Sequence, residues 1–258
     1  MIKSTNLSKE AASPLSPHLE MLKGLPLFAG VDAGALRGIL QYARVTDHEK
    51  GDMIFMQGER ATRFYIILEG FVKLFKGNAD GAESILQILT TGEMLLETAI
   101  FNDAPFPVSA QAVDGVKLLS IPATIIRKNI ADNKALASNM LAEVAGRSQA
   151  LITQFEQVTL KNAVQRIGWF LLKLSLQNGG GAGEIKLPYD KSLIAGYLGM
   201  KPETFSRTLQ ILKEQGVDVE RGTVSLTNAF ALCAYCDTDL ATKCSRAGSD
   251  ACPNPDCI

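Results

Sequence analysis

The sequence predicts an α+β protein in which an antiparallel β-roll of the jelly-roll type precedes a long helix and a winged helix-turn-helix. Three observations predict this order. Glycines punctuate short apolar runs up to residue 122, a seven-residue apolar repeat follows, and two short helical patterns then meet at Gly199. The expected segments are a flexible arm at 1–20, the β-roll domain at 21–132, a dimerisation helix at 133–160, the winged helix-turn-helix domain at 161–230 and a cysteine-rich tail at 231–258.

The β-roll is predicted from glycines that recur between short apolar runs. Apolar runs at 53–56, 64–68, 71–75 and 85–89 lie between recurrent glycines. Short β-rich runs with turn residues every ten or so positions are typical of antiparallel rolls and barrels. A short helix is expected just before them, at 33–42, because its leucines and isoleucine recur at helical spacing.

The long helix carries an apolar repeat that alternates by four and three residues. Such a repeat is a coiled-coil seam, which is buried only against a partner helix, so we expect a homodimer. The alternative is a helix packed on its own roll. The predicted seam is Ala137, Leu141, Val144, Ser148, Leu151, Phe155 and Val158, with Ser148 its one polar member.

Residues 190–216 have the pattern of a helix-turn-helix. Asp190 is a suitable N-cap for the first helix, Gly199 ends it, and Pro202 suits the first position of the second helix. An amphipathic helix at 161–177 and a strand at 184–187 are expected before the motif, and a β-hairpin wing at 217–226 after it. In the second helix Phe205, Leu209 and Leu212 should point inward, which leaves Glu203, Ser206, Arg207 and Gln210 outward.

These outward residues have the chemistry of base recognition. Arginine can bond guanine through two hydrogen bonds, glutamate can accept from the cytosine amino group, and serine can contact a base edge. Lys191 and Lys201 lie near the helix starts, where phosphate contacts are expected, and Thr204 is a further candidate DNA contact. The alternative is an ordinary helical hairpin with a solvated face. Double-stranded DNA is the favoured partner, although the net charge is only −1, because residues 161–230 hold 9 basic and 6 acidic side chains.

The segment Lys201-Pro-Glu-Thr-Phe-Ser-Arg207 resembles the recognition helix of the FNR branch of CRP/FNR transcription regulators. The resemblance implies that Glu203, Ser206 and Arg207 read a TTGAT half-site in a palindrome, and that an activator would contact RNA polymerase. Phe205 before Ser-Arg is similar to the denitrification regulators of that branch. The cyclic-nucleotide-binding-like roll of the family is matched at Gly51-Asp52, Gln57-Gly58-Glu59, Phe64-Tyr65, Gly70-Phe-Val-Lys-Leu74 and Gly92-Glu93, so the likeness extends to about Cys233.

The family resemblance is less informative about the signal that the protein senses. Members that bind cyclic AMP hold it with a Glu and an Arg-Ser pair, and the resemblance keeps Glu97 but places Pro107 and Val108 at the pair. A buried phosphate would then lack a cation, so we do not expect cyclic AMP to bind and expect Glu97 to be a structural hydrogen-bond partner. Haem would need a ligand such as His18 or His48, both expected to be surface residues.

The cysteine tail is the remaining candidate sensor. Cys233, Cys236, Cys244, Cys252 and Cys257 all lie in the last 26 residues. Their spacing is C-x2-C-x7-C-x7-C-x4-C, and the first pair can chelate one metal. An iron–sulfur cluster that responds to oxygen, nitric oxide or redox state is the favoured interpretation, while structural zinc and thiol/disulfide switching stay open.

Other classes of protein are disfavoured by what the sequence lacks. It has no apolar run near the roughly 18 residues of a membrane span and no apolar block behind its N-terminal lysines, so a cytoplasmic protein is expected. We find no nucleophile–base pair, P-loop or dinucleotide-binding turn, so no enzyme is expected. A cyclic-nucleotide-binding module of an enzyme or channel is a further alternative, against which the complete helix-turn-helix argues.

Overall fold

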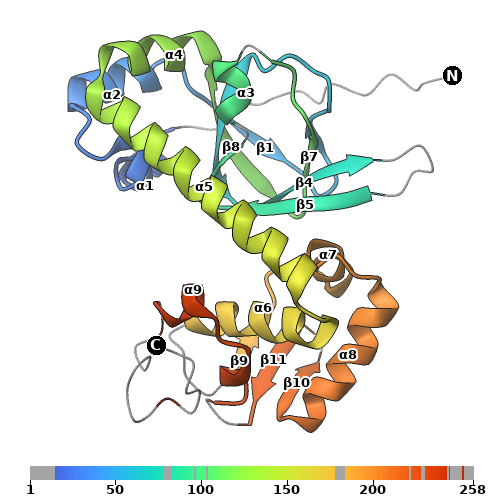
Figure 1. The fold of residues 1–258 in the computed structure, drawn as a ribbon. Coiled ribbons are helices and arrows are strands. Elements are labelled where there is room, and N and C mark those ends of the chain that lie inside the picture. Colours follow the sequence, from blue (N-terminus) through green and yellow to red (C-terminus); the bar gives the residue numbers. More distant parts are fainter. Residues whose placement is uncertain are drawn as a thin grey trace, which may run out of the picture. The chain divides into compact units, whose positions relative to one another are not determined.

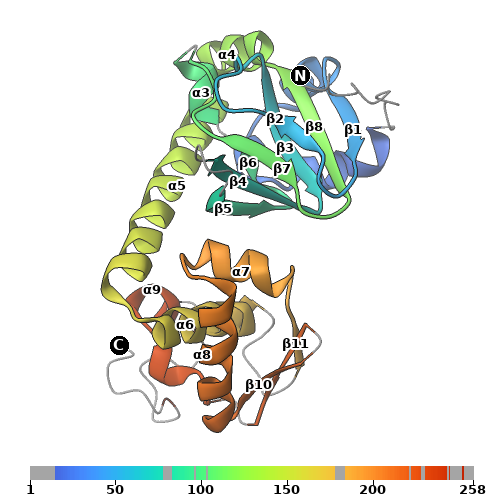
Figure 2. The same ribbon diagram turned by 90° about the vertical axis from the view of Figure 1, so that its right-hand side faces the viewer.

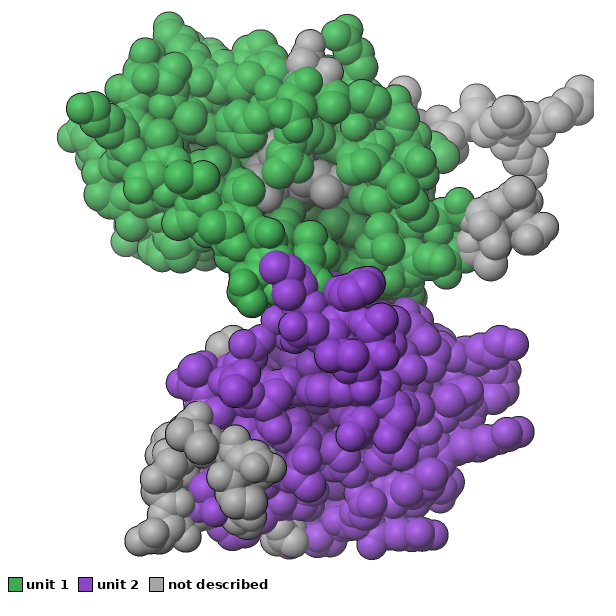
Figure 3. Space-filling model, viewed as in Figure 1, with its two compact units in different colours: residues 1–151 green, residues 152–258 purple. Residues whose placement is uncertain are grey.

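The computed structural model describes residues 15–77, 83–95, 97–102, 104–177, 184–220, 222–227, 230–242, 244 and 252. The chain divides into two compact units, residues 1–151 and 152–258 (Figure 3). The boundary falls inside one long helix, so the last turns of that helix belong to the second unit.

Two antiparallel four-stranded sheets form the roll of the first unit within the described residues (Figures 1 and 2). Their strand orders are β1-β8-β3-β6 and β2-β7-β4-β5. The strands are β1 (Arg44–His48), β2 (Met53–Phe55), β3 (Arg63–Glu69), β4 (Phe71–Gly77), β5 (Glu83–Thr90), β6 (Met94–Leu95), β7 (Ser109–Ala112) and β8 (Val116–Pro122).

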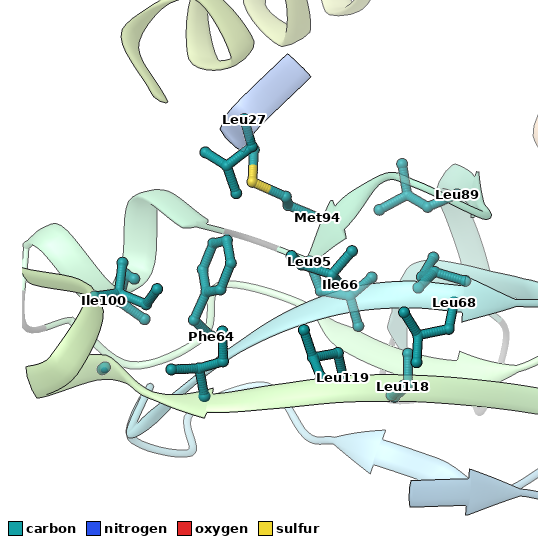
Figure 4. Close-up of a cluster of buried hydrophobic side chains, with 14 of the residues drawn as sticks. Leu27, Phe64, Ile66, Leu68, Leu89, Met94, Leu95, Ile100, Leu118 and Leu119 are labelled. Atoms are coloured by element: carbon teal, nitrogen blue, oxygen red, sulfur yellow. The ribbon is translucent and has the colours of Figure 1, made fainter. Parts of the chain in front are cut away.

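The roll is filled by apolar side chains from its central strands. Phe64 and Ile66 of β3 pair with Ile121 and Leu119 of β8, and all four are fully buried (Figure 4 shows part of this core). The turn between β3 and β4 needs glycine at Gly70, whose φ is +89° and where a Cβ would lie 2.4 Å from a carbonyl oxygen. The predicted β-roll is therefore confirmed, and the four expected apolar runs differ from the observed strands by at most two residues at either end.

Short helices come before β1, between β6 and β7, and after β8. The chain is already helical from Ser16, so the boundary expected at residue 20 falls inside α1, where Leu22 is fully buried. Residues 1–14 of the expected arm lie outside the description. These elements are η1 (Ser16–His18), α1 (Leu19–Lys23), η2 (Pro26–Phe28), α2 (Ala33–Leu40), α3 (Glu97–Phe101) and α4 (Ala123–Asp132).

The long helix α5 (Lys134–Leu160) packs its first turns on the roll. Leu136 and Met140 are buried in the roll's core, and Asn139 Nδ2 donates to the carbonyls of Leu27 and Ala29 at 3.0 and 2.7 Å. The alternative of a helix packed on its own roll thus holds for this face of α5. The seam lies on another face.

The second unit is a winged helix-turn-helix around its own core, which α6 supplies with Ile167, Trp169, Phe170 and Leu171. A three-stranded antiparallel sheet of order β10-β11-β9 forms the wing. No described helix is both long and apolar enough to cross a membrane. The elements are α6 (Ala163–Gln177), β9 (Glu184–Lys186), α7 (Lys191–Tyr197), α8 (Pro202–Glu214), β10 (Val217–Glu220), β11 (Thr223–Leu226), η3 (Cys233–Tyr235) and α9 (Thr238–Ala241).

Candidate nucleic-acid interface

Helix α8 begins as the sequence predicts. Gly199 has a φ of +64°, Lys201 is the extended N-cap residue, and Pro202 follows as the first helical residue. The N–H of Met200 donates to the carbonyl of Ala195 at 3.0 Å and closes the turn between α7 and α8. This local geometry fixes where α8 starts.

The two faces of α8 separate as predicted. Phe205, Leu209 and Leu212 are buried in the core of the unit. Residues 203, 206, 207 and 210 of α8 form one exposed stripe, since helical neighbours lie three and four residues apart. Lys201 and Thr204 are exposed beside this stripe, so six of the seven predicted DNA-contacting side chains are open to solvent.

Arg166 of α6 supports the turn, a role that the sequence did not reveal. Its Nη1 donates to the carbonyls of Leu198 and Gly199 at 2.7 and 3.3 Å. Orphan carbonyls at the end of α7 are satisfied in this way, so the turn is held from the core side. Only a contact across 32 residues identifies this role, and no local pattern carries it.

Salt bridges connect the wing to α8. Lys213 Nζ lies 2.8 Å from Asp218 and 3.4 Å from Glu220 of β10. Hydrogen bonding to Asp218 raises the pKa of Lys213, and the same bond from Lys213 lowers the pKa of Asp218. The pair thus favours its charged forms and braces the C-terminal end of α8 against the wing.

At the start of α7 the structure shows a contact of Lys191 and the geometry of the predicted N-cap, Asp190. Lys191 Nζ donates to the carbonyl of Val219 at 3.0 Å, so its ammonium connects α7 to the wing, and its phosphate contact stays a prediction. Asp190 is at the N-cap position with an extended backbone, but its carboxylate makes no capping hydrogen bond to α7. Asp237 does make such a bond, to the N–H of Leu240 at 3.1 Å in α9.

The predicted seam of α5 is largely exposed. Leu141 is 70% exposed and Phe155 68%, with Leu151 and Val158 close to half exposed. Ser148 is exposed, while Ala137 and Val144 are half-buried. Ile152 and Leu160 add exposed apolar surface that the repeat does not include.

Candidate effector residues of the roll are placed as follows. Val108 is buried in the roll's core and Pro107 is exposed, while Glu97 begins α3 and its side chain is not described. His48 is half-buried on β1, with Nε2 3.0 Å from the hydroxyl of Thr46, and His18 is half-buried in η1.

The tail cysteines are only partly described. Cys233, Cys236, Cys244 and Cys252 are each half-buried, and Cys257 lies outside the described residues. Within the described part of the chain, no three His, Cys, Asp or Glu side chains gather as metal ligands. The expected metal centre thus stays a prediction.

Comparison with known proteins gives the family. A model of the cyclic nucleotide-binding domain matches residues 45–133, and a model of the Crp-like helix-turn-helix domain matches residues 165–235. A CRP-like cAMP-activated global transcriptional regulator from Mycobacterium tuberculosis is 27% identical over 200 residues, which cover 76% of this chain and 89% of the relative. The nitrogen fixation regulation protein FixK from Rhizobium meliloti is 29% identical over 196 residues, or 75% and 87%.

A solved structure agrees over a larger part of the chain. A Ruegeria pomeroyi protein described as cyclic-nucleotide binding is 31% identical with a TM-score of 0.60, and the match covers 86% of this chain and 98% of that one. The names of these relatives do not single out the FNR branch, which stays a prediction. With a matching roll, long helix and helix-turn-helix in one order, the chain belongs to the CRP/FNR family of DNA-binding transcription regulators.

Proposed function

We propose that the chain binds, as a homodimer, a palindromic DNA site with TTGAT half-sites. The observation that carries the proposal is the exposed stripe of Glu203, Ser206 and Arg207 at the start of α8, with a buried apolar face behind it. Such a helix is suited to entering the major groove, because its N-terminal residues are polar and its opposite face is packed in the core of the unit. Gln210 continues the stripe, Thr204 lies beside it, and Lys201 is exposed where it could contact a phosphate.

A second copy of this chain is the occupant that best suits the exposed face of α5. The apolar repeat is the seam of a two-stranded coiled coil. Two of its members, Leu151 and Phe155, are exposed large apolar side chains. A palindrome and a two-fold dimer require one another, because each half-site then meets an equivalent α8. RNA polymerase becomes a further partner where the bound dimer activates transcription.

Binding-site selection from random duplex DNA tests this reading of α8. We expect an enriched palindrome of two TTGAT-type half-sites whose centres lie one or two helical turns apart, about 10–11 or 20–22 base pairs. Sedimentation of the protein–DNA complex should give two chains per duplex. A single unpaired half-site, or a motif without the guanine of TTGAT, would contradict the proposal.

For the signal, we propose a soft-metal centre on the tail cysteines, with an iron–sulfur cluster as the first candidate. Five thiols in 26 residues support it, since thiolates prefer such metals. Cys233 and Cys236 would supply one chelating pair, and Cys244, Cys252 and Cys257 the other thiolates. When bound, a cluster would supply sensitivity to oxygen, nitric oxide or redox state.

Anaerobic purification with an absorption spectrum and metal analysis separates the alternatives. A brown protein that bleaches in air, and stays colourless when Cys233 and Cys236 are replaced by Ser, is expected. Colourless protein with about one zinc per chain would make the tail a structural zinc site. A Soret band would instead indicate a haem-dependent nitric oxide sensor, with His18 and His48 as the first ligands to replace.

Cyclic AMP is not part of the proposed mechanism. The buried methyl groups of Val108 offer no hydrogen bond to a phosphate, and Pro107 has no N–H. Calorimetric titration with cyclic AMP should give no heat of binding, and a micromolar affinity would restore the roll as a nucleotide sensor. A role in transcription also places the protein in the cytoplasm, with its DNA.

A further inference from the structure

The chain does not leave the DNA-binding unit after the wing. Residues Leu232–Ala241, which we term the brace, fold back onto α6, and Figures 1 and 2 show α9 beside that helix. Leu232 and Leu240 are 1% and 2% exposed and belong to the same core as Trp169. The first part of the tail is therefore a structural part of the winged helix-turn-helix.

Two carboxylates of the brace hold the last turns of α5. Asp237 Oδ2 accepts from Lys161 Nζ at 2.8 Å and from Gln157 Nε2 at 3.2 Å. Asp239 Oδ2 accepts from the hydroxyl of Thr153 at 2.7 Å. Thr153 and Gln157 are four residues apart on α5, and Lys161 is the first residue after the helix ends, so the brace holds a single stripe at the end of α5.

This stripe lies away from the proposed dimer seam. Gln157 is only 4% exposed, whereas Phe155, two residues earlier, is 68% exposed. Residues two apart on a helix differ by about 200° around its axis, so they point in nearly opposite directions. The last turns of α5 therefore present one face to a partner chain and the other to the brace.

The ring of Tyr235 connects the brace to the recognition helix. It lies directly on Gly168 of α6, where a Cβ would be 2.3 Å from the ring carbons. Its hydroxyl donates to the side chain of Gln215, the C-cap residue of α8. A single side chain thus contacts α6 and the end of α8.

Cys233 and Cys236 lie on either side of Tyr235 in the sequence. Cys233 begins the 3-10 helix that ends at Tyr235, and Cys236 stands between Tyr235 and Asp237. The thiol of Cys236 donates to the carbonyl of Asp237 at 3.6 Å, a bond that a metal-bound or alkylated sulfur cannot make. Any chemistry at this pair therefore acts on the residues that hold α5, α6 and α8 together.

We propose that the brace transmits the chemical state of Cys233 and Cys236 to the end of α5 and to α8, and so sets DNA affinity. The proposal rests on the proposed role of the tail as the sensor, but it names the route. Modification loosens Asp237 from Lys161 and Tyr235 from Gly168, and α8 loses a fixed orientation relative to α5. Dimerisation is unaffected, because the seam lies on the other face.

N-ethylmaleimide is the probe, because a cysteine thiol adds across its carbon–carbon double bond to give a thioether without any oxidant. Metal-free full-length protein is labelled, and mass spectrometry verifies thioethers on Cys233 and Cys236. We expect DNA affinity to fall at least about fivefold. Trp169, the only tryptophan, should report the change in its fluorescence, because Lys161 Nζ lies 5.7 Å from its ring.

Two variants establish the route. Asp237→Asn should lower affinity before labelling and leave labelling little further effect. Glu69→Gln is the matched control, because Glu69 also pairs with a lysine, Lys117 at 2.7 Å, but lies in the roll. The control should respond to labelling as the wild type does.

Labelled wild-type protein with unchanged DNA affinity and unchanged Trp169 fluorescence overturns the proposal. A full response in Asp237→Asn overturns the route through the carboxylate. If that variant folds poorly, hydrogen exchange of the wild-type protein still tests the route, because the labelled protein should lose amide protection at 153–161. Unlabelled protein that fails to bind any DNA would contradict the proposed function instead.

Discussion

Arg207 is the side chain on which sequence discrimination should depend most. It is exposed on α8 beside Glu203 and Ser206, where it can reach the edge of a guanine. We expect Arg207→Ala to cost about 1–3 kcal/mol on a TTGAT palindrome and to relax the preference at the guanine. Binding-site selection on both proteins checks this. The same motif from wild type and variant would remove Arg207 from the reading residues.

Lys201 provides the contrast to Arg207. It is the exposed N-cap residue of α8, one step before the base-reading stripe, and should contact a phosphate. Lys201→Ala should weaken all duplexes alike and reduce the slope of log affinity against log salt by about one. Titrations at several salt concentrations, on specific and random DNA, measure it. A loss confined to the specific duplex would make Lys201 a base contact.

Gly168 tests the packing of Tyr235. An alanine methyl at this position would overlap the ring, so we expect Gly168→Ala to destabilise the unit by about 1–3 kcal/mol. Denaturant unfolding followed by Trp169 fluorescence measures it. Gly38→Ala in α2 is the matched control, because its methyl group meets open space. The higher helix propensity of alanine should raise the free energy of unfolding of this variant by about 0.5–1 kcal/mol.

At the residue scale the sequence was informative where chemistry is local. Helical spacing and the positions of Gly199 and Pro202 were enough to place Glu203, Ser206 and Arg207 outward. It could not reveal Arg166, whose partners are carbonyls 32 and 33 residues away. The bond from Lys191 to the carbonyl of Val219 was equally invisible, because it forms only once the sheet of the wing is folded, and the phosphate contact of Lys191 stays a prediction.

At the scale of elements, α5 tests the dimer. Phe155→Glu puts a charge into the proposed helix–helix seam, where no partner is at hand and burial of an unpaired charge is costly. We expect monomers in sedimentation at micromolar concentration and loss of binding to the palindrome. A variant that remains dimeric would refute the seam.

Glu156→Gln is a neighbouring control on α5, where the native side chain is exposed and the substitution adds no charge. It should remain dimeric. The helix itself was predicted to within a residue or two, because a seven-residue repeat is visible in sequence alone. Its other faces were not, since the burial of Leu136 against the roll and of Gln157 against the brace depends on segments distant in the chain.

For the whole molecule, sequence patterns recover the order of the domains but not their limits. The predicted boundary between the long helix and the DNA-binding domain is at 160/161, whereas the compact units divide at 151/152. The difference arises because Thr153 and Gln157 bond to the brace, and a contact across some 80 residues leaves no local signal. For the same reason the expected tail boundary at 230/231 separates Leu232 and Leu240 from the core to which they belong.

Two truncations distinguish structure from sensing in the tail. A chain that ends at Phe230 loses Leu232 and Leu240, and each buried leucine contributes about 1.5–3 kcal/mol. We therefore expect it to lower the free energy of unfolding reported by Trp169 by several kcal/mol and to bind DNA weakly. A chain that ends at Cys244 keeps the brace but lacks Cys252 and Cys257, so it should keep that stability while losing any centre that needs four thiolates. Equal stability of both chains would show that the brace contributes nothing to the fold, and full metal content in the longer one would restrict the ligands to Cys233, Cys236 and Cys244.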